Sequence, residues 1–238
     1  MRLHEWQETL LAPLKLPPVQ ENRGKNEHAK ARGPELAGVA VRRSAAYDAS
    51  KRLADTVLGG IALALSLPFW IWAVTLILLT DGWPCLYSQT RVGRGGRIFT
   101  LYKFRSMIKD AEKHTGPVLA DKADPRVTRI GRIMRKTAVD EIPQLISIFR
   151  GDMSWVGPRP ERPELVREFL RDIPGYWRRY RVKPGLTGLA QVCGHYRSTP
   201  EEKLVYDLEY IRRRTLWLDL QIWLLSWANT FFGRWGAK

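Results

Sequence analysis

VLGGIALALSLPFWIWAVTLILL, residues 57–79, is a run of 23 residues without a charged side chain. As a straight helix it would measure about 34 Å, enough to cross the roughly 30 Å hydrocarbon core of a bilayer. Pro68 stands at its centre, and proline breaks or kinks a helix because it lacks an N–H and clashes with the preceding turn. Ser66 can hydrogen-bond a backbone group that this break leaves free. The stretch therefore predicts either a kinked transmembrane helix or a re-entrant helix, which enters the membrane, bends and returns.

Basic residues flank this stretch on both sides: Arg42, Arg43, Lys51 and Arg52 precede it, and Arg91, Arg94, Arg97, Lys103 and Arg105 follow it. Positive side chains beside a membrane segment tend to remain in the cytoplasm. A single crossing would place one basic flank on the far side, whereas a re-entrant helix keeps both inside. The charges therefore favour a re-entrant helix over residues 50–82, with a kinked transmembrane helix as the alternative.

Three charged residues stand at the entrance to the apolar stretch, namely Lys51, Arg52 and Asp55. Spacings of three and four residues place their side chains on one face of a helix. A lipid phosphate could join the two cations on that face. We therefore predict that this group meets the lipid head groups.

The chain of 238 residues is strongly basic, with 39 Lys and Arg against 24 Asp and Glu and a net charge of +15. Such a charge favours an anionic partner: nucleic acid, lipid head groups or phosphorylated small molecules. Cys85 and Cys193 stand far apart, which indicates neither a disulfide framework nor a zinc site. Residues 1–49 are polar and contain Pro and Gly. They predict a flexible extension that lacks the apolar core of a signal peptide.

Residues 87–104, YSQTRVGRGGRIFTLYKF, alternate in the manner of two strands around a Gly/Arg turn and predict a β-hairpin. The glycines of the turn resemble a phosphate-binding loop, but such a loop is followed by a helix rather than a second strand. Residues 91–136 carry thirteen Lys and Arg against four Asp and Glu. Within them, Arg129, Arg132 and Arg135 share one face of a predicted helix. That face is either solvated or a cationic wall for a phosphate.

Asp140 and Glu141 stand three and two residues before Pro143, a residue tolerated in the first turn of a helix. The pair is therefore expected at a helix start, where the helix dipole favours ionised carboxylates. Adjacent residues point about 100° apart on a helix, so the two carboxylates are suited to different roles. One could hold a cation while the other attacks. Taken alone, however, the pair fits a capping Asp followed by a first-turn Glu.

The segment GPRP, residues 157–160, adds a reactive context to this pair. Two prolines stiffen the backbone around Arg159, and a rigid arginine suits bidentate binding of a phosphate. Phosphoryl transfer requires positioning and charge neutralisation, usually with a divalent cation. A rigid arginine, paired carboxylates and a basic field together favour that chemistry.

Six segments follow one another in order: KRLAD at 51, QTRVGRGG at 89, FTLYKFRSM at 99, DPRVTRIGRIMRKTAVDEIPQL at 124, GDMSWVGPRP at 151 and KPGLTGLAQVCG at 183. Together they resemble the bacterial sugar transferases that are monotopic phosphoglycosyl transferases, over about residues 50–233. The resemblance implies transfer of a sugar 1-phosphate from a nucleotide diphosphate sugar, with UDP as the expected nucleotide, to undecaprenyl phosphate.

The resemblance also implies a role for individual residues. Asp140 is expected to be the nucleophile that forms an aspartyl-phosphosugar intermediate, and Glu141 a ligand of Mg²⁺. Arg135 and Arg159 are expected near phosphate, and Asp207 close to the metal. Two further basic residues are assigned to phosphate binding, namely Lys103 and Arg105. The Lys51–Arg52–Asp55 motif opens the re-entrant helix in this family, whereas Leu67 between Ser66 and Pro68 departs from the family's usual Ser-Pro bend.

The C-terminal third predicts a helix that ends at Pro174–Gly175 and a second helix over residues 200–214, which carries Asp207. Residues 216–235, LWLDLQIWLLSWANTFFGRW, contain tryptophans among leucines with polar interruptions. This pattern predicts an interfacial helix that lies on the membrane. A buried core helix is the alternative.

These observations predict an α+β fold, mainly α, with a re-entrant membrane helix, interfacial amphipathic helices and a small β-hairpin. Residues 1–49 would form the extension, residues 50–82 the re-entrant helix, and residues 83–238 a catalytic domain on the cytoplasmic face of the bacterial inner membrane. The expected partners are a nucleotide diphosphate sugar, undecaprenyl phosphate and membrane lipids, without nucleic acid, and the chain is a candidate homodimer. The rival functions are a membrane-tethered nucleic-acid binder, although the chain lacks a recognition module for it, and a membrane scaffold.

Overall fold

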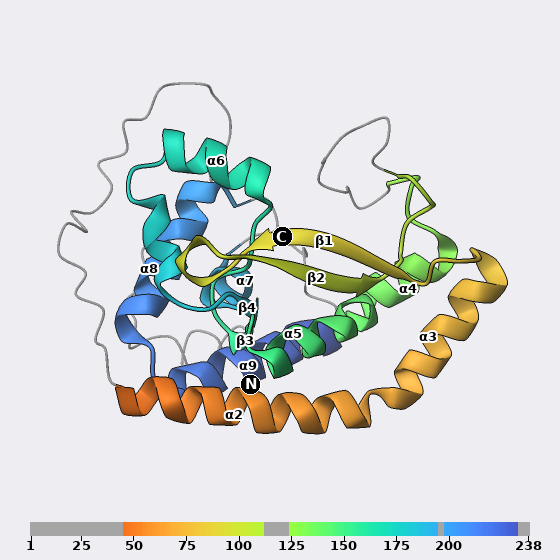
Figure 1. The fold of residues 1–238 in the computed structure, drawn as a ribbon, viewed down its shortest axis with the longest axis horizontal. Coiled ribbons are helices and arrows are strands. Elements are labelled where there is room, and N and C mark those ends of the chain that lie inside the picture. Colours follow the sequence, from red (N-terminus) through yellow and green to blue (C-terminus); the bar gives the residue numbers. More distant parts are fainter. Residues whose placement is uncertain (1–44, 112–123, 195–197, 233–238) are drawn as a thin grey trace.

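The computed structural model describes residues 45–111, 124–194 and 198–232, so nearly all of the predicted extension 1–49 lies outside the described residues. The described chain is mainly helical, with one small antiparallel hairpin (Figure 1). This confirms the two predicted features of the fold class, a mainly helical chain and a small β-hairpin. The hairpin lies above the long N-terminal helix, and the remaining helices surround it.

The apolar stretch forms two helices, α2 (Ala45–Leu65) and α3 (Leu67–Thr80), which meet at a bend of 53°. Pro68 lies in the first turn of α3, where a missing N–H costs no helical hydrogen bond. The Ser66 hydroxyl donates to the carbonyl of Leu63 at 2.7 Å, which confirms that this serine hydrogen-bonds backbone at the bend. Among the described residues, neither helix alone is long and apolar enough to cross a membrane, but the bent pair passes by length and composition.

Most apolar side chains of this helix pair face away from the rest of the protein. The exposed ones are Leu53, Val57, Leu58, Ile61, Leu65, Leu67, Phe69, Ile71, Trp72, Leu78 and Leu79. On the opposite side of α3, Ala73 and Ile77 are buried against Phe104 and Met134. An exposed apolar surface of this extent marks an interaction site on a protein or a membrane.

The predicted hairpin is confirmed: β1 (Leu86–Val92) pairs antiparallel with β2 (Ile98–Phe104). A short 3₁₀ turn, η2 (Arg94–Gly96), joins them. Gly95 and Gly96 take positive φ angles of 67° and 78°, a conformation that favours glycine. The glycines therefore make a turn, because a strand and not a helix follows them.

The basic helix α4 (Arg129–Lys136) is confirmed, and Thr128 caps it by accepting the N–H of Gly131 at 2.9 Å. The helix lies against the backbone that follows β2. A Cβ atom on Gly131 would stand 1.9 Å from the carbonyl oxygen of Ser106. Only glycine therefore allows α4 to approach this segment so closely.

We expect Gly131→Ala to lower the free energy of unfolding by about 2 to 3 kcal/mol, because the methyl group must push two backbone segments apart. Gly60→Ala is the matched control. Its Cβ would meet only the side chain of Phe149, at 3.3 Å, and alanine in a helix gains up to about 1 kcal/mol over glycine. Denaturant unfolding of both variants in detergent measures the difference. Equal effects of the two substitutions would contradict this account of Gly131.

After α4 the chain forms the 3₁₀ helix η3 (Val139–Gln144) and α5 (Leu145–Arg150). The strands β3 (Ser154–Val156) and β4 (Gly185–Thr187) then pair in parallel. Between and after them stand α6 (Pro163–Asp172), the 3₁₀ helix η4 (Tyr176–Arg181), α7 (Leu189–Cys193) and α8 (Pro200–Arg213). The main core forms where these elements meet, around Tyr176, Tyr210 and Ile211.

The last helix, α9 (Leu216–Phe231), combines both sequence interpretations. One face is buried in the main core through Leu218, Ile222 and Leu225. The opposite face exposes Trp217 and Trp227 among leucines and phenylalanines. The alternative of a core helix is therefore correct for one face only, and the exposed aromatic face keeps the interfacial interpretation open.

Candidate active site

The acidic pair lies in the first turn of η3, as predicted for a helix start. The preceding residue, Ala138, takes a left-handed conformation with φ of 56°. Such a conformation is strained for alanine and costs about 1 kcal/mol or more. It turns the chain sharply between α4 and η3, which brings Asp140 and Glu141 against the hairpin.

Two cations from different elements hold Glu141. Lys103 of β2 donates to its Oε1 atom at 2.6 Å, and Arg159 of the GPRP segment donates to the same atom at 2.7 Å. Burial raises the pKa of Glu141, but the charges and hydrogen bonds of Arg159 and Lys103 outweigh burial and hold that pKa well below its ordinary value. The structure therefore brings together three residues that the sequence assigned to the site, with Glu141 ionised.

Asp140 has a different environment, although it is the next residue. It is 6% exposed, and among the described residues no donor hydrogen-bonds to its carboxylate. Burial raises its pKa to about 6, against the charge of Lys103 and with help from the charge of Glu141. Burial therefore outweighs the helix start at Asp140, although a carboxyl group with this pKa is still mostly ionised at neutral pH.

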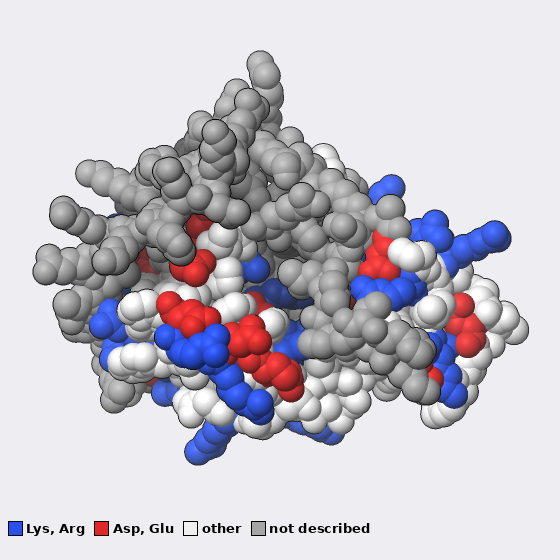
Figure 2. All heavy atoms as spheres, turned by 90° about the horizontal axis from the view of Figure 1, so that it is seen from above, with Lys and Arg blue, Asp and Glu red and all other residues white. Residues whose placement is uncertain are grey.

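Arg135 completes the basic surroundings of Asp140. Its Nε donates to the Ser106 hydroxyl at 2.8 Å. Its charge, with those of Lys103 and Arg159, lowers the pKa of Asp140. Figure 2 shows basic side chains deep in the hollowed middle of one face, with acidic atoms beside them. Three cations around two carboxylates leave a positive excess that suits a phosphorylated substrate.

Two of the predicted site residues are placed elsewhere. Arg105 donates to the carbonyls of Asp81 and Gly82 at 2.6 and 2.8 Å, so it caps the end of α3 and is not turned toward the acidic pair. Asp207 is buried in an ion pair with Arg179 at 2.8 Å. Burial raises the pKa of Asp207 to about 6, although Arg179 lowers it. The phosphate role of Arg105 and the metal role of Asp207 are therefore not supported by their contacts.

The motif that opens α2 is also turned toward the protein. Lys51 forms an ion pair with Asp219 of α9 at 2.8 Å. Arg52 donates to two carbonyls at the C-terminal end of α5, each at 3.0 Å, where a helix attracts a cation. Asp55 accepts from the Ser154 hydroxyl and the Trp155 N–H, each at 3.1 Å. These side chains fasten α2 to α9, α5 and β3, and the predicted joint site for a lipid phosphate stays a prediction.

A divalent cation is compatible with the donor set, although the protein alone offers little for it. The described residues contain no group of three or more His, Cys, Asp or Glu side chains able to hold a metal. Mg²⁺ is usually held by one or two carboxylates together with water and substrate phosphates. Asp140 and Glu141 meet that requirement, provided that a phosphorylated substrate supplies the remaining oxygens.

Sequence reasoning assigned no role at the site to Arg91, Arg179 or Asp219. Each has at least one partner that is distant in sequence. Asp219, for example, accepts from Tyr47, which lies 172 positions away. A buried charge in an otherwise apolar helix was the only local signal for Asp219. Nothing separates Arg91 or Arg179 from the other arginines of this basic chain.

The chain matches a family model for bacterial sugar transferases over residues 46–233. It is 41% identical over 81% of its length to the UDP-N-acetylgalactosamine-undecaprenyl-phosphate N-acetylgalactosaminephosphotransferase of Aeromonas hydrophila, of which it covers 46%. It is 41% identical over 74% of its length to the UDP-glucose:undecaprenyl-phosphate glucose-1-phosphate transferase of Caulobacter vibrioides, of which it covers 68%. It is 36% identical over 79% of its length to the undecaprenyl-phosphate galactose phosphotransferase of Salmonella typhimurium, of which it covers 41%.

These relatives carry different sugars in their names, while undecaprenyl phosphate is common to all three. The chain spans about half the length of the Aeromonas relative. The family model, in contrast, covers nearly all of the described fold, including the hairpin, the acidic pair and the GPRP segment. The chain belongs to the bacterial sugar transferase family.

Proposed function

We propose that this protein transfers a sugar 1-phosphate from a UDP-sugar to undecaprenyl phosphate and releases UMP. The observation that carries the proposal is the division of the acidic pair. Glu141 is held ionised between two cations, whereas Asp140 is buried beside the same cations without a hydrogen-bond donor among the described residues. A buried carboxylate that no donor occupies is poorly solvated and free to attack an electrophile.

In the first step, a carboxylate oxygen of Asp140 attacks the β-phosphorus of the donor. A bond forms between this oxygen and phosphorus, the bond from phosphorus to the bridging oxygen breaks, and UMP leaves with the bonding electrons. In the second step, a phosphate oxygen of undecaprenyl phosphate attacks the same phosphorus. The bond to Asp140 breaks, which regenerates the carboxylate. Two displacements through a covalent species predict ping-pong kinetics.

The basic residues neutralise charge in both steps. Arg135, Lys103 and Arg159 all act on Asp140 electrostatically, and positively charged groups at a transferring phosphoryl stabilise its transition state. Mg²⁺, when bound by Glu141 and the substrate phosphates, would supply further neutralisation of the diphosphate. Glu141 already accepts hydrogen bonds from Lys103 and Arg159. The main effect of Glu141 is therefore to hold these two cations beside the reacting phosphorus.

The exposed apolar surface of α2 and α3 supports a place in a bacterial membrane, where undecaprenyl phosphate is held. We propose that the pair is re-entrant, entering and leaving at the cytoplasmic face. Basic residues on both flanks favour this topology. The bend at Ser66 and Pro68, and the attachment of α2 to the same domain that carries the acidic pair, are consistent with it. The aromatic face of α9 would lie at the same membrane surface.

Pro68→Ala is expected to straighten the α2–α3 bend and to shift part of the protein to a spanning topology. Alanine restores the helical N–H and removes the clash with the preceding turn. Ser50→Cys and Ser88→Cys place reporters on either side of the helix pair, in a background without Cys85 and Cys193. A membrane-impermeant thiol reagent, applied to intact cells, should label neither reporter in the parent protein and one of the two after Pro68→Ala. Labelling of one reporter in the parent would contradict re-entry.

The proposed reaction is tested with purified protein, undecaprenyl phosphate and a panel of UDP-sugars, with Mg²⁺ or with EDTA. UMP should appear with at least one sugar, only when Mg²⁺ is present. Without the lipid, a donor labelled at its β-phosphorus should leave label on the protein. Failure of every UDP-sugar to release UMP, together with tight binding of nucleic acid at physiological salt, would reject the proposal in favour of a nucleic-acid binder.

A further inference from the structure

The turn that carries Arg159 is held largely through its carbonyl groups. Pro158 and Pro160 flank this arginine, and proline has no N–H to donate. Four successive carbonyls, of residues 158–161, each accept one hydrogen bond. The donors are the Gly185 N–H at 2.9 Å, the Arg179 Nη2 at 2.8 Å, the Arg91 Nη1 at 2.9 Å and the Val92 N–H at 3.0 Å.

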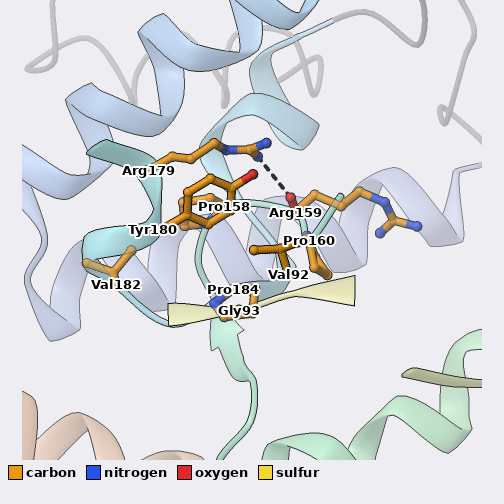
Figure 3. A pocket seen from close by; sticks show the side chains of 9 residues that line it. All are labelled: Val92, Gly93, Pro158, Arg159, Pro160, Arg179, Tyr180, Val182 and Pro184. Atoms are coloured by element: carbon orange, nitrogen blue, oxygen red, sulfur yellow. Dashed lines mark hydrogen bonds between the residues drawn. The ribbon is translucent and has the colours of Figure 1, made fainter. Parts of the chain in front are cut away.

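Arg179 holds the carbonyl of Arg159 itself (Figure 3). It is 3% exposed, forms the ion pair with Asp207 at 2.8 Å and contacts the hydroxyl of Tyr176. Its guanidinium also lies 5.0 Å from the centre of the Tyr176 ring. A guanidinium fixed on three sides has little freedom to move. Asp207 therefore has a defined role in the structure, which is to hold Arg179 in this position.

A second arginine, Arg91, hydrogen-bonds the next carbonyl of the turn. It extends from β1, donates to Pro160 and contacts Gln89, and its Nη1 lies 3.8 Å from Glu161. Burial lowers its pKa to about 10, and the charge of Arg159 contributes to that shift. Arg91 therefore stays charged at neutral pH.

In Figure 3, the Arg159 guanidinium points away from Arg179 and from the small pocket that Tyr180 and the two prolines line. In this orientation, the Nη2 of Arg159 donates to the Oε1 of Glu141 at 2.7 Å. Arginine is suited to both supporting positions, because a guanidinium offers several N–H donors in a fixed plane and can hold a carbonyl while it pairs with a carboxylate.

We infer that Arg91 and Arg179 are positioning residues. By hydrogen-bonding the carbonyls of Pro160 and Arg159, respectively, they fix the place of the Arg159 side chain. The inference rests on the proposed function only for its effect on activity. The contacts themselves predict that loss of either hydrogen bond displaces the backbone of the turn and separates Arg159 from Glu141. A displacement of about 1 Å in such a group can cost about 100-fold in rate.

The activity test uses Arg179→Gln, Arg91→Gln and Arg159→Gln, singly and as Arg159→Gln pairs. Each supporting substitution should lower kcat by about 10- to 100-fold with a smaller change in KM. Added to Arg159→Gln, neither should lower kcat further, because both act through Arg159. Arg171→Gln is the matched control, since Arg171 is exposed and forms its ion pair, within the described part of the chain, with its neighbour Asp172. It should leave kcat unchanged. Multiplicative losses in the double variants would overturn the inference.

A second measurement reads Arg159 without any substrate. In NMR spectra of the arginine Nε–H groups, the Arg159 signal of the parent protein should be distinct and protected from solvent exchange. Arg179→Gln and Arg91→Gln should move it toward the position of exposed arginines, while Arg171→Gln should not. An Arg159 signal that neither substitution moves would overturn the inference. A parent protein that releases no UMP would reject the proposed function and leave this measurement valid.

Discussion

Asp140→Asn is expected to abolish transfer, with kcat for UMP release lowered by about 1,000-fold or more. An amide oxygen does not act as a nucleophile toward phosphorus at a useful rate, and removal of an attacking group costs several orders of magnitude. The label retained on the protein from a β-phosphorus-labelled donor should disappear as well. Asp152→Asn is the control. Asp152 is exposed, lies twelve positions further along the chain, and undergoes the same change from carboxylate to amide.

The same substitution should stabilise the fold. Burial raises the pKa of Asp140 to about 6 from the ordinary value of 3.8. Because the folded pKa lies above the unfolded one, ionised Asp140 lowers stability progressively as the pH rises from about 4 to about 6, and asparagine does not. In metal-free protein at pH 7, Asp140→Asn should raise the free energy of unfolding by about 1 to 3 kcal/mol. The gain should vanish near pH 4.

These two results together separate a catalytic residue from a structural one. A capping aspartate, the alternative that the sequence leaves open, would lose about 1 kcal/mol of stability on the same replacement. It would also leave kcat within a small factor of the parent. Full activity of Asp140→Asn, or a clear loss of stability at neutral pH, would therefore contradict the assignment of Asp140 as nucleophile.

The features that could be predicted from the sequence are those with local causes. The hairpin follows from alternating side chains around a glycine turn, and α4 from a helical pattern that begins after Thr128. The acidic pair and Arg159 could be identified because nearby prolines restrict the backbone at each site. Local stereochemistry is visible in a single sequence, since neighbouring residues are sufficient to impose it.

The assignments that changed depend on where a side chain points after the chain has folded. Lys103 and Arg105 stand two positions apart, which in a continuing strand would place them on one face. The strand β2 ends at Phe104, so only Lys103 reaches Glu141 while Arg105 turns to the end of α3. The pairing of Asp207 with Arg179 likewise joins α8 to η4. No spacing rule within one helix predicts that contact.

Lys51 and Asp219 illustrate the same limit at the contact between α2 and α9. Sequence spacing placed Lys51 with Arg52 and Asp55 on one helix face, where a lipid phosphate could bind. The structure instead supplies its counter-ion from α9, 168 positions away. One of the polar interruptions in residues 216–235, Asp219, is the point at which α9 contacts α2 through an ion pair.

Asp219→Ala is expected to produce the largest loss of stability among the substitutions considered. The Asp219 carboxylate accepts from Tyr47 at 2.9 Å, Lys51 at 2.8 Å and Tyr210 at 2.7 Å, and so joins α2, α8 and α9. Its removal leaves a largely buried ammonium without its counter-ion and takes one acceptor from each of two tyrosine hydroxyls. Breaking one partner of a buried ion pair costs about 3 to 5 kcal/mol. For a chain of this size, Tm should fall by about 10 °C.

A double substitution separates the effect of the Lys51–Asp219 ion pair from the effect of the packing around it. Lys51→Met together with Asp219→Leu removes both charges, and it should recover most of the stability that Asp219→Ala loses, because no unpaired ammonium remains. Asp172→Ala is the control for loss of an exposed pair and should change stability by less than about 0.5 kcal/mol. A Tm for Asp219→Ala within 2 °C of the parent would show that Lys51 finds another partner, such as a lipid phosphate. That outcome would restore the head-group role that the sequence first suggested for this lysine.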